Sequence, residues 1–295
     1  MPTLTRDRII VETFRYFHRW MPRRVFAKFK TILLRDHERW GKLGRLPRQL
    51  HGNPYWLLLS MGHGAQREAY LRGYWYEIDL NMLMDQYLKA GHVFIDIGAN
   101  IGIYTLHGAY RVGDTGRVIA VEPNPIIFKV LQGHVAINRL RNVRLYNVAL
   151  GREQGTLALK GCTDDTGYST ARPNFRLDRE ETRLEVPMET GDALLRDIPD
   201  DAVGLCKIDV EGMEQIVLEG MPVFLATHRH IIYNVEITDD WLQQMGGSAH
   251  ALFDLFKAYG FAPYAIDTLQ NGHHDPIDGP LDNAYQYNVL FKPLT

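Results

Sequence analysis

The chain has 295 residues, of which 45% are hydrophobic, and a formal net charge of −2 at pH 7. This length and apolar content allow a sizeable core and favour one α/β domain with an N-terminal extension. Only two cysteines are present, Cys162 and Cys206, and their wide separation excludes a disulfide framework or a Cys-x-x-Cys zinc site. The sequence contains neither a long transmembrane-type apolar run nor a secretory signal pattern, so we expect a cytoplasmic protein.

The N-terminal segment is basic, whereas the remainder of the chain is acidic. Residues 1–48 carry 13 Lys or Arg against 4 Asp or Glu. Over residues 1–35 apolar positions recur every three or four residues, which predicts amphipathic helix interrupted at Pro22. Its apolar face could cap the main domain or could lie peripherally on the inner face of a membrane, and its aromatic residues disfavour nucleic acid. We therefore predict a basic helical extension over 1–68 and a main domain over 69–295.

From residue 80 onward, helices and strands alternate regularly. The apolar runs predict strands at Val93–Ile97, Arg117–Val121, Val143–Val148, Leu205–Ile208 and Ile231–Ile237. Helices are expected over 80–88, after the first strand through Tyr110, and over Pro125–Asn138. This order predicts an α/β fold, a doubly wound, mostly parallel, seven-stranded sheet with helices on both faces.

Two further regions are expected to form antiparallel pairs. Short alternating stretches at Thr156–Leu159 and Arg183–Val186 predict a small hairpin. The C-terminal runs Phe261–Ile266 and Tyr285–Phe291 predict a pair that closes the sheet. Their connection, 267–284, is interpreted as a loop whose His273 and His274 are solvated, although a metal cluster or a base in a lid is the alternative.

The strongest local motif joins the first strand to its helix. Gly98 and Gly102 follow Val93–Ile97 and allow the backbone to turn sharply against a ligand, with a spacing unlike the dinucleotide fingerprint. Asp96 at the strand end opposes a phosphate but attracts the sulfonium and ammonium groups of S-adenosylmethionine. Glu122 ends the next strand, where a carboxylate can accept both ribose hydroxyls.

Several stretches resemble the FkbM family of S-adenosylmethionine-dependent methyltransferases. Asp96–Thr105 looks like its first motif, Glu122–Pro125 its second, and Lys207–Glu214 its most diagnostic stretch. Val235–Ile237 is similar to the strand that follows, whereas Gly191 before Asp192 departs from the family pattern. The resemblance covers about residues 70–292 and implies a Rossmann-like class I methyltransferase fold. It implies cofactor contacts from Glu77, Asp96, Gly98, Ala99, Asn100, Gly102, Tyr104, Thr105, Glu122, Pro123 and Asn124.

A second group of ionisable residues follows the strand at Leu205–Ile208. Lys207, Asp209 and Glu211 alternate there, and Glu236 ends the neighbouring strand, so Asp209 and Glu236 should face one crevice. We predict that one of these two carboxylates accepts the proton of an acceptor hydroxyl, with Lys207 or Glu211 orienting it. Alternatively, Asp209 and Glu236 could hold Mg²⁺, although no third ligand is identifiable.

The resulting functional hypothesis is methyl transfer to a hydroxyl on a sugar, glycolipid or polyketide-like small molecule. The variable segments 151–190 and 267–284 are expected to select this small-molecule or glycan acceptor. The alternatives are a NAD-dependent oxidoreductase and a membrane-docking protein with an inactive methyltransferase fold. The sequence does not indicate the oligomeric state.

Overall fold

The computed structural model describes residues 7–13, 22, 24, 40, 42–50, 52–73, 78–162, 169–173, 181–199, 202–267, 273–281 and 285–294. The chain forms two compact units. One contains residues 1–78, and the other contains residues 79–163 and 167–295. Among the helices of these described segments, none is both long enough and apolar enough to cross a bilayer.

The first unit contains a β-hairpin, which the prediction of a helical extension did not include. Strand β1 (Arg45–Gln49) pairs antiparallel with β2 (Trp56–Ser60). Helix α4 (Gly64–Arg72) follows and continues past the predicted boundary at residue 68. Residues 7–13 are helical, whereas most of the predicted amphipathic segment, and Glu77, lie outside the described residues.

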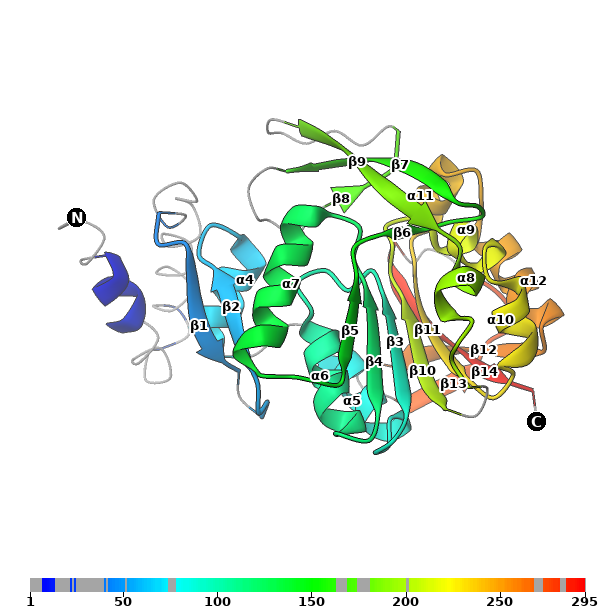
Figure 1. Cartoon of the computed structure of the whole chain (residues 1–295), viewed down its shortest axis with the longest axis horizontal. Helices are drawn as coiled ribbons and strands as arrows, with labels where there is room; N and C mark the ends of the chain where they lie inside the picture. Colours follow the sequence, from blue (N-terminus) through cyan, green and yellow to red (C-terminus); the bar gives the residue numbers. More distant parts are fainter. Residues whose placement is uncertain are drawn as a thin grey trace. The chain divides into compact units, whose positions relative to one another are not determined.

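The second unit is built on a mostly parallel sheet of eight strands (Figure 1). Its order is β13-β12-β14-β11-β10-β3-β4-β5. The parallel strands are β3 (Val93–Ile97), β4 (Arg117–Val121), β5 (Val143–Tyr146), β10 (Val203–Ile208) and β11 (Ile232–Ile237). The antiparallel strands are β12 (Phe261–Asp267), β13 (His273–Pro276) and β14 (Tyr287–Pro293). The central strands β3 and β10 are mostly apolar because both of their faces are buried, and Asp96 and Lys207 are their charged exceptions.

Helices cover both faces of this sheet, which confirms the doubly wound prediction. One face packs on α5 (Ile78–Tyr87), α6 (Ile103–Val112) and α7 (Pro125–Ile137) through a core that includes Phe94 and Leu205. The other packs on α8 (Gly191–Leu195), α9 (Glu214–Glu219), α10 (Pro222–Thr227), α11 (Asp239–Gln244) and α12 (Ala249–Ala258). The chain leaves central β3 toward β5 and returns at β10, so the switch point where such sheets bind ligands lies between β3 and β10.

The region predicted as a C-terminal loop contributes an eighth strand. In β13, His274 pairs with Ile266 of β12, and its Nε2 lies 2.9 Å from the hydroxyl oxygen of Tyr87 on α5. A residue interpreted as solvated therefore joins the sheet edge to a helix.

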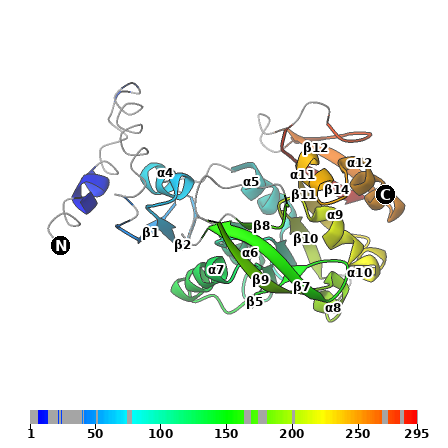
Figure 2. The ribbon, with the colours of Figure 1, turned by 90° about the horizontal axis from the view of Figure 1, so that it is seen from above.

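A second sheet of four strands lies beyond the carboxyl ends of β4 and β5 (Figures 1 and 2). Its order is β6 (Ala149–Leu150), β9 (Glu181–Glu189), β7 (Gly155–Cys162) and β8 (Ser169–Thr170). The antiparallel pair β7–β9 confirms the predicted hairpin and extends it at both ends. This placement brings the variable segment 151–190 to the switch point of the main sheet.

Candidate active site

A pocket opens at the switch point between the two sheets. The main sheet contributes Ile97, Gly98, Asn100, Val121, Glu122, Pro123, Asp209, Val210, Glu211 and Met213. Across from them lie Val148, Ala149, Leu150, Leu157, Leu159, Ser169, Thr170 and Ala171. The strand ends of β3, β4 and β10 therefore supply the polar side of the pocket. The second sheet, together with Val148 just before it, supplies most of the apolar side.

Gly98 permits the strand ends to meet. Its φ is +79°, and a Cβ at this position would lie 1.8 Å from the backbone oxygen of Asp209. The backbone N–H of Asp209 in turn donates to the carbonyl of Ile97 over 3.1 Å. The turns after β3 and β10 are thus in direct contact, and only glycine fits between them.

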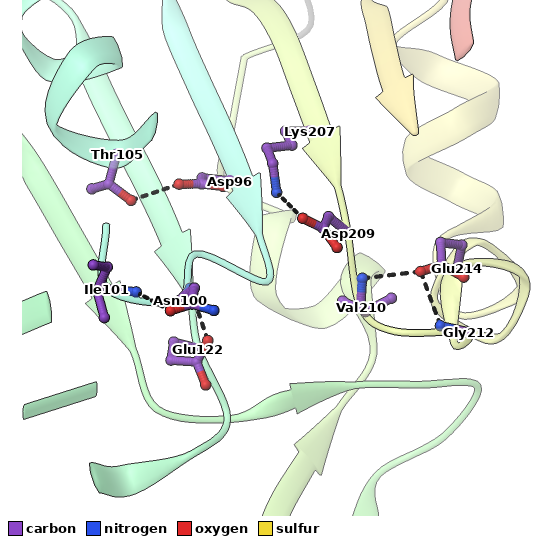
Figure 3. Close-up of polar contacts among 10 residues, drawn as sticks. All are labelled: Asp96, Asn100, Ile101, Thr105, Glu122, Lys207, Asp209, Val210, Gly212 and Glu214. Carbon is purple, nitrogen blue, oxygen red and sulfur yellow. Dashed lines mark hydrogen bonds and ion pairs between the residues drawn. The ribbon is translucent and has the colours of Figure 1, made fainter. Parts of the chain in front are cut away.

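Glu122 is held in the pocket by two backbone donors, of which Figure 3 shows the N–H of Asn100. The N–H of Asn100 donates to Oε2 over 2.9 Å, and the N–H of Asn124 donates to Oε1 over 2.8 Å. Burial raises the pKa of Glu122 to about 7, against the opposing effect of these two hydrogen bonds. Each oxygen retains acceptor capacity, since a carboxylate offers about four lone-pair sites.

Asp96 lies behind the pocket and does not line it. It is fully buried, and its Oδ2 accepts the hydroxyl of Thr105 over 2.6 Å. Burial raises the pKa of Asp96, while Lys207, its register partner on β10, opposes the rise. Among the described residues, its Oδ1 has no hydrogen-bond partner. The Thr105 hydroxyl that was predicted to contact a cofactor therefore serves Asp96.

Lys207, Asp209 and Glu236 form a coupled group beside the pocket. Lys207 Nζ lies 2.9 Å from Asp209 Oδ2 (Figure 3), and a side-chain hydrogen bond joins Glu236 to Asp209. Burial and then the Asp209 charge raise the pKa of Glu236. Burial opposes the Lys207 charge, but Asp209 and Asp96 outweigh it and raise the pKa of Lys207. Glu236 therefore holds a proton more readily than an ordinary glutamate, as expected for a buried carboxyl group beside another carboxyl group.

The turn after Asp209 is supported from two directions. Glu211 has a left-handed φ of 58°, a conformation that costs a non-glycine residue about 1–2 kcal/mol. Glu214 Oε1 accepts the N–H groups of Val210 and Gly212 over 3.0 and 3.2 Å and so fixes the turn. Arg172 after β8 lies 3.4 Å from Glu211. Non-glycine residues with a left-handed backbone conformation, such as Glu211, are found more often at functional sites than elsewhere.

Arg172, Trp241, Ser169 and Gln286 belong to this neighbourhood but were not identified from the sequence. Arg172 Cζ lies 3.8 Å from the centre of the Trp241 ring. Ser169 Oγ accepts Asn124 Nδ2 over 2.6 Å and ties β8 to the turn after β4. Gln286 lowers the pKa of the nearby Glu236 carboxyl group, against the larger effect of burial. No sequence signal marked Arg172, because its burial and its partners are visible only in the structure.

The predicted site residues divide into lining and supporting positions. Gly98, Asn100, Glu122, Pro123, Asp209 and Glu211 line the pocket. Asn124 is buried and accepts the N–H of Ile126 as the N-cap of α7. Ala99, Gly102 and Tyr104 are packed at the start of α6, where a Cβ on Gly102 would meet Leu131. Lys207 and Glu236 lie next to Asp209 but do not line the pocket, so the single crevice predicted for Asp209 and Glu236 is not seen there.

The donor set at Asp209 does not favour a divalent metal. Lys207 already places a cation against its carboxylate. Within the described segments, no three His, Cys, Asp or Glu side chains are grouped as metal ligands. The residues at Asp209 therefore do not fit Mg²⁺.

A central β3 with β4 and β5 on one side, β10 and β11 on the other, and a final antiparallel pair defines the Rossmann-like class I methyltransferase fold. Residues 96–263 match the family model described as Methyltransferase FkbM domain. The chain belongs to the FkbM methyltransferase family.

Curated relatives include methyltransferases from fungi and bacteria. Methyltransferase 1 of Beauveria bassiana (strain ARSEF 2860) is 29% identical over 57% of this chain and 71% of its own length. The 31-O-demethyl-FK506 methyltransferase FkbM of Streptomyces tacrolimicus is 29% identical over 45% of this chain and 61% of its own length. A crystal structure of methyltransferase FkbM from Methylobacillus flagellatus KT superposes with a TM-score of 0.40 at 14% identity, covering 77% of this chain and 53% of that chain.

Proposed function

We propose that this protein is an S-adenosylmethionine-dependent O-methyltransferase that acts on a hydroxyl of a sugar, glycolipid or polyketide-like small molecule. The observation that carries the proposal is one pocket bordered by Glu122 on one side and by Asp209, paired with Lys207 and Glu236, on the other. The printed name of the Streptomyces relative, a 31-O-demethyl methyltransferase, supports oxygen as the acceptor atom.

The residues of the pocket fit this donor. Glu122 keeps one acceptor position on each oxygen for a pair of hydroxyls, and the ribose of S-adenosylmethionine presents such a pair. Leu157, Leu159 and Pro123 supply an apolar surface that suits a purine ring. Asp209 and Glu211 place carboxyl groups on the wall of the pocket, which favours a ligand with sulfonium and ammonium groups.

Bound S-adenosylmethionine supplies a methyl group that leaves sulfur as its S–C bond breaks and the new O–C bond forms, so that S-adenosylhomocysteine remains. Asp209, whose side chain is 29% exposed and lines the pocket, accepts the proton that the acceptor hydroxyl loses. The ion pair with Lys207 holds the Asp209 carboxylate in place. Glu236 retains its own proton and donates it to Asp209 as a hydrogen bond, which orients the base.

The donor half of the proposal is tested by calorimetry with S-adenosylmethionine and S-adenosylhomocysteine. We expect micromolar binding, about −8 kcal/mol, to wild type and to Glu153→Gln, an exposed-site control. Glu122→Ala should lose this binding. Absence of binding to wild type would overturn the proposal.

The chemical half is tested by transfer of a labelled methyl group to candidate hydroxyl acceptors. Asp209→Asn should lower the rate by about 10²–10⁴, the contribution of a general base. Glu236→Gln, which keeps a donor toward Asp209, should lower it less. A larger loss in Glu236→Gln than in Asp209→Asn would show that Glu236, rather than Asp209, accepts the proton.

A further inference from the structure

A second cavity, here called the arginine cavity, lies where β4 and β5 begin, at the edge of the main sheet away from the second sheet (Figure 1). The end of α6 with the loop that follows it contributes Tyr110 and Asp114, and the loop between α7 and β5 contributes Arg139, Arg141 and Asn142. Its volume is about 380 Å³, within the range of roughly 300–1,000 Å³ that small-molecule sites occupy. It shares no lining residue with the pocket at the switch point, so the two are separate.

Asn142 fixes the two sides of the arginine cavity relative to each other. Its Nδ2 donates to the carbonyl of Ala109 over 2.8 Å and to the carbonyl of Gly113 over 2.9 Å. The backbone carbonyl of Asn142 accepts the N–H of Val118 in β4 over 2.8 Å. The two loops are therefore tied to each other and to the sheet. A cavity that is already formed spares a ligand the cost of ordering it.

The charge of the arginine cavity favours an anion. Arg139 and Arg141 are exposed, and neither guanidinium has an ion-pair or hydrogen-bond partner within the described part of the chain. Asp114 opposes these two positive charges with one negative charge. Guanidinium groups bind phosphate oxygens through paired, charge-assisted hydrogen bonds. Two arginines on one cavity therefore favour a phosphate group.

Arg139 occupies a backbone position that glycine usually takes. It follows Asn138, the C-cap of α7, and has a φ of 55°. The N–H groups of Arg139 and Leu140 donate to the carbonyls of Ala136 and Val135, which are the two hydrogen bonds of a Schellman motif. Glycine adopts this left-handed conformation without strain, whereas a side chain makes it less favourable. Such strain at a cavity wall is expected where the side chain serves binding.

Tyr110 adds an aromatic ring to the same cavity. The residue is 40% exposed although it lies on a helix of the main domain. Aromatic rings pair with one another in offset or edge-on arrangements, and each pair adds to the effect of apolar burial. A ligand that has both a phosphate and a ring can therefore use the arginines and Tyr110 together.

We propose that the arginine cavity binds a soluble phosphate monoester that carries an aromatic ring. Arg139 and Arg141 hold the phosphate, and Tyr110 lies against the ring. This site does not depend on the proposed methyl transfer, because it lies at the opposite ends of the strands that carry Glu122 and Asp209 toward the pocket at the switch point.

The test is calorimetry on the full chain at a fixed salt concentration, with phenyl phosphate, glycerol phosphate and phenol as probes. We expect phenyl phosphate to bind, glycerol phosphate to bind more weakly, and phenol to show no binding. Arg141→Ala should weaken phenyl phosphate binding about tenfold or more, the scale of one lost hydrogen bond between charged groups. Tyr110→Ala should reduce the affinity for phenyl phosphate to that for glycerol phosphate. Asp114→Asn should tighten binding of both esters, because it removes the opposing charge.

Arg139→Gly separates a binding role from a structural one. Glycine relieves the left-handed strain at this position, so the thermal unfolding midpoint should equal or exceed that of wild type. The affinity for phenyl phosphate should nevertheless fall about tenfold or more. The matched control is Arg229→Ala, which removes another exposed arginine from the same edge of the sheet, just before β11. It should bind phenyl phosphate as wild type does, and so should Glu122→Ala, which alters the other pocket.

Several results would overturn the proposal. One is the absence of binding by both esters, and another is an equal loss of affinity in Arg229→Ala, which would show only a general effect of charge. Binding that is lost in Glu122→Ala but kept in Arg139→Gly and Arg141→Ala would assign the probe to the switch point. Binding to vesicles of phosphatidylcholine with phosphatidate, without binding of the soluble esters, would assign the arginines to a lipid surface instead.

Discussion

Glu122 must be ionised to accept two hydroxyl donors, yet burial raises its pKa to about 7. Binding of S-adenosylhomocysteine favours the charged form of Glu122. A protein molecule that holds a proton on Glu122 therefore releases it when the ligand binds. We predict that affinity for S-adenosylhomocysteine falls as the pH drops below about 7 and levels off above it. Calorimetry across this range measures the effect and the proton released.

The matched variant for this prediction is Glu122→Gln. Its amide cannot titrate and can accept fewer hydroxyls, so binding should be weaker and should lose the pH dependence attributed to Glu122. Glu153→Gln should keep the wild-type profile, because Glu153 is exposed. An unchanged profile in Glu122→Gln would assign the dependence to another group.

The site residues that directly follow a strand could be predicted from the sequence, because the carboxyl ends of neighbouring parallel strands lie together at one edge of the sheet. Glu122 and Asp209 are of this kind. Arg172 and Gln286 could not be identified, since they come from a turn-rich segment and from the approach to an antiparallel strand. Arg172 lies near Glu211, and Gln286 lies near Glu236, because of how the second sheet and β14 pack against the main sheet. No local sequence pattern predicts that packing.

At the scale of elements, the contact between the turns after β3 and β10 depends on the missing side chain of Gly98. Gly98→Ala adds a Cβ 1.8 Å from a backbone oxygen at φ +79°. We predict a loss of about 2–4 kcal/mol of unfolding free energy, from left-handed strain plus overpacking. Urea unfolding measures it.

Gly260→Ala is the control for the backbone contribution alone. Gly260 has φ +85°, but a Cβ there meets nothing within 4 Å. Gly260→Ala should lower the free energy of unfolding by only about 1 kcal/mol. Similar losses of unfolding free energy in both variants would show that the turns after β3 and β10 can move apart around the added methyl group without further loss of stability.

Asp192 links two helices on one face of the sheet. From α8, its carboxylate accepts the N–H groups of Val223 and Phe224 over 3.0 and 2.8 Å, at the first turn of α10. Asp192→Ala should therefore destabilise the fold by about 0.5–2 kcal/mol, as for a lost cap, without altering donor affinity. Asp197→Ala, at a side chain 87% exposed, should have little effect on unfolding. A loss of donor binding in Asp192→Ala would contradict this structural role.

The elements that the sequence predicted share a strong periodic or continuous apolar pattern. Apart from Asp96 and Lys207, strands β3 and β10 carry no charged residue, because helices cover both faces of the sheet. The hairpin strand Arg45–Gln49 contains two arginines and a proline, and β13 reads His-His-Asp-Pro, so neither shows strand periodicity. These strands form through pairing with a neighbour, a tertiary effect that overrides local propensity.

At the scale of the whole molecule, burial raises the pKa of several carboxyl groups around the switch point. Burial raises the pKa of Glu122 and of Glu214 from 4.5 to about 7, and it also raises the pKa of Asp96 and Glu236. The folded state therefore holds protons that the unfolded chain has released. This contribution to stability is complete below the unfolded pKa and is lost as the pH rises through the folded pKa.

Glu214→Gln isolates one such contribution, because Glu214 supports the turn after β10 from a buried position. Between pH 4.5 and about 7, wild type should lose stability relative to Glu214→Gln by about 1.4 kcal/mol per pH unit, on the order of 3 kcal/mol in all. Urea unfolding across this range measures the difference, with exposed Glu153→Gln as the control. The buried histidine His107, whose pKa burial lowers, acts in the opposite sense in both proteins and cancels in the comparison. A difference that stays constant with pH would mean that Glu214 is ionised in the folded state, held by its two backbone donors despite burial.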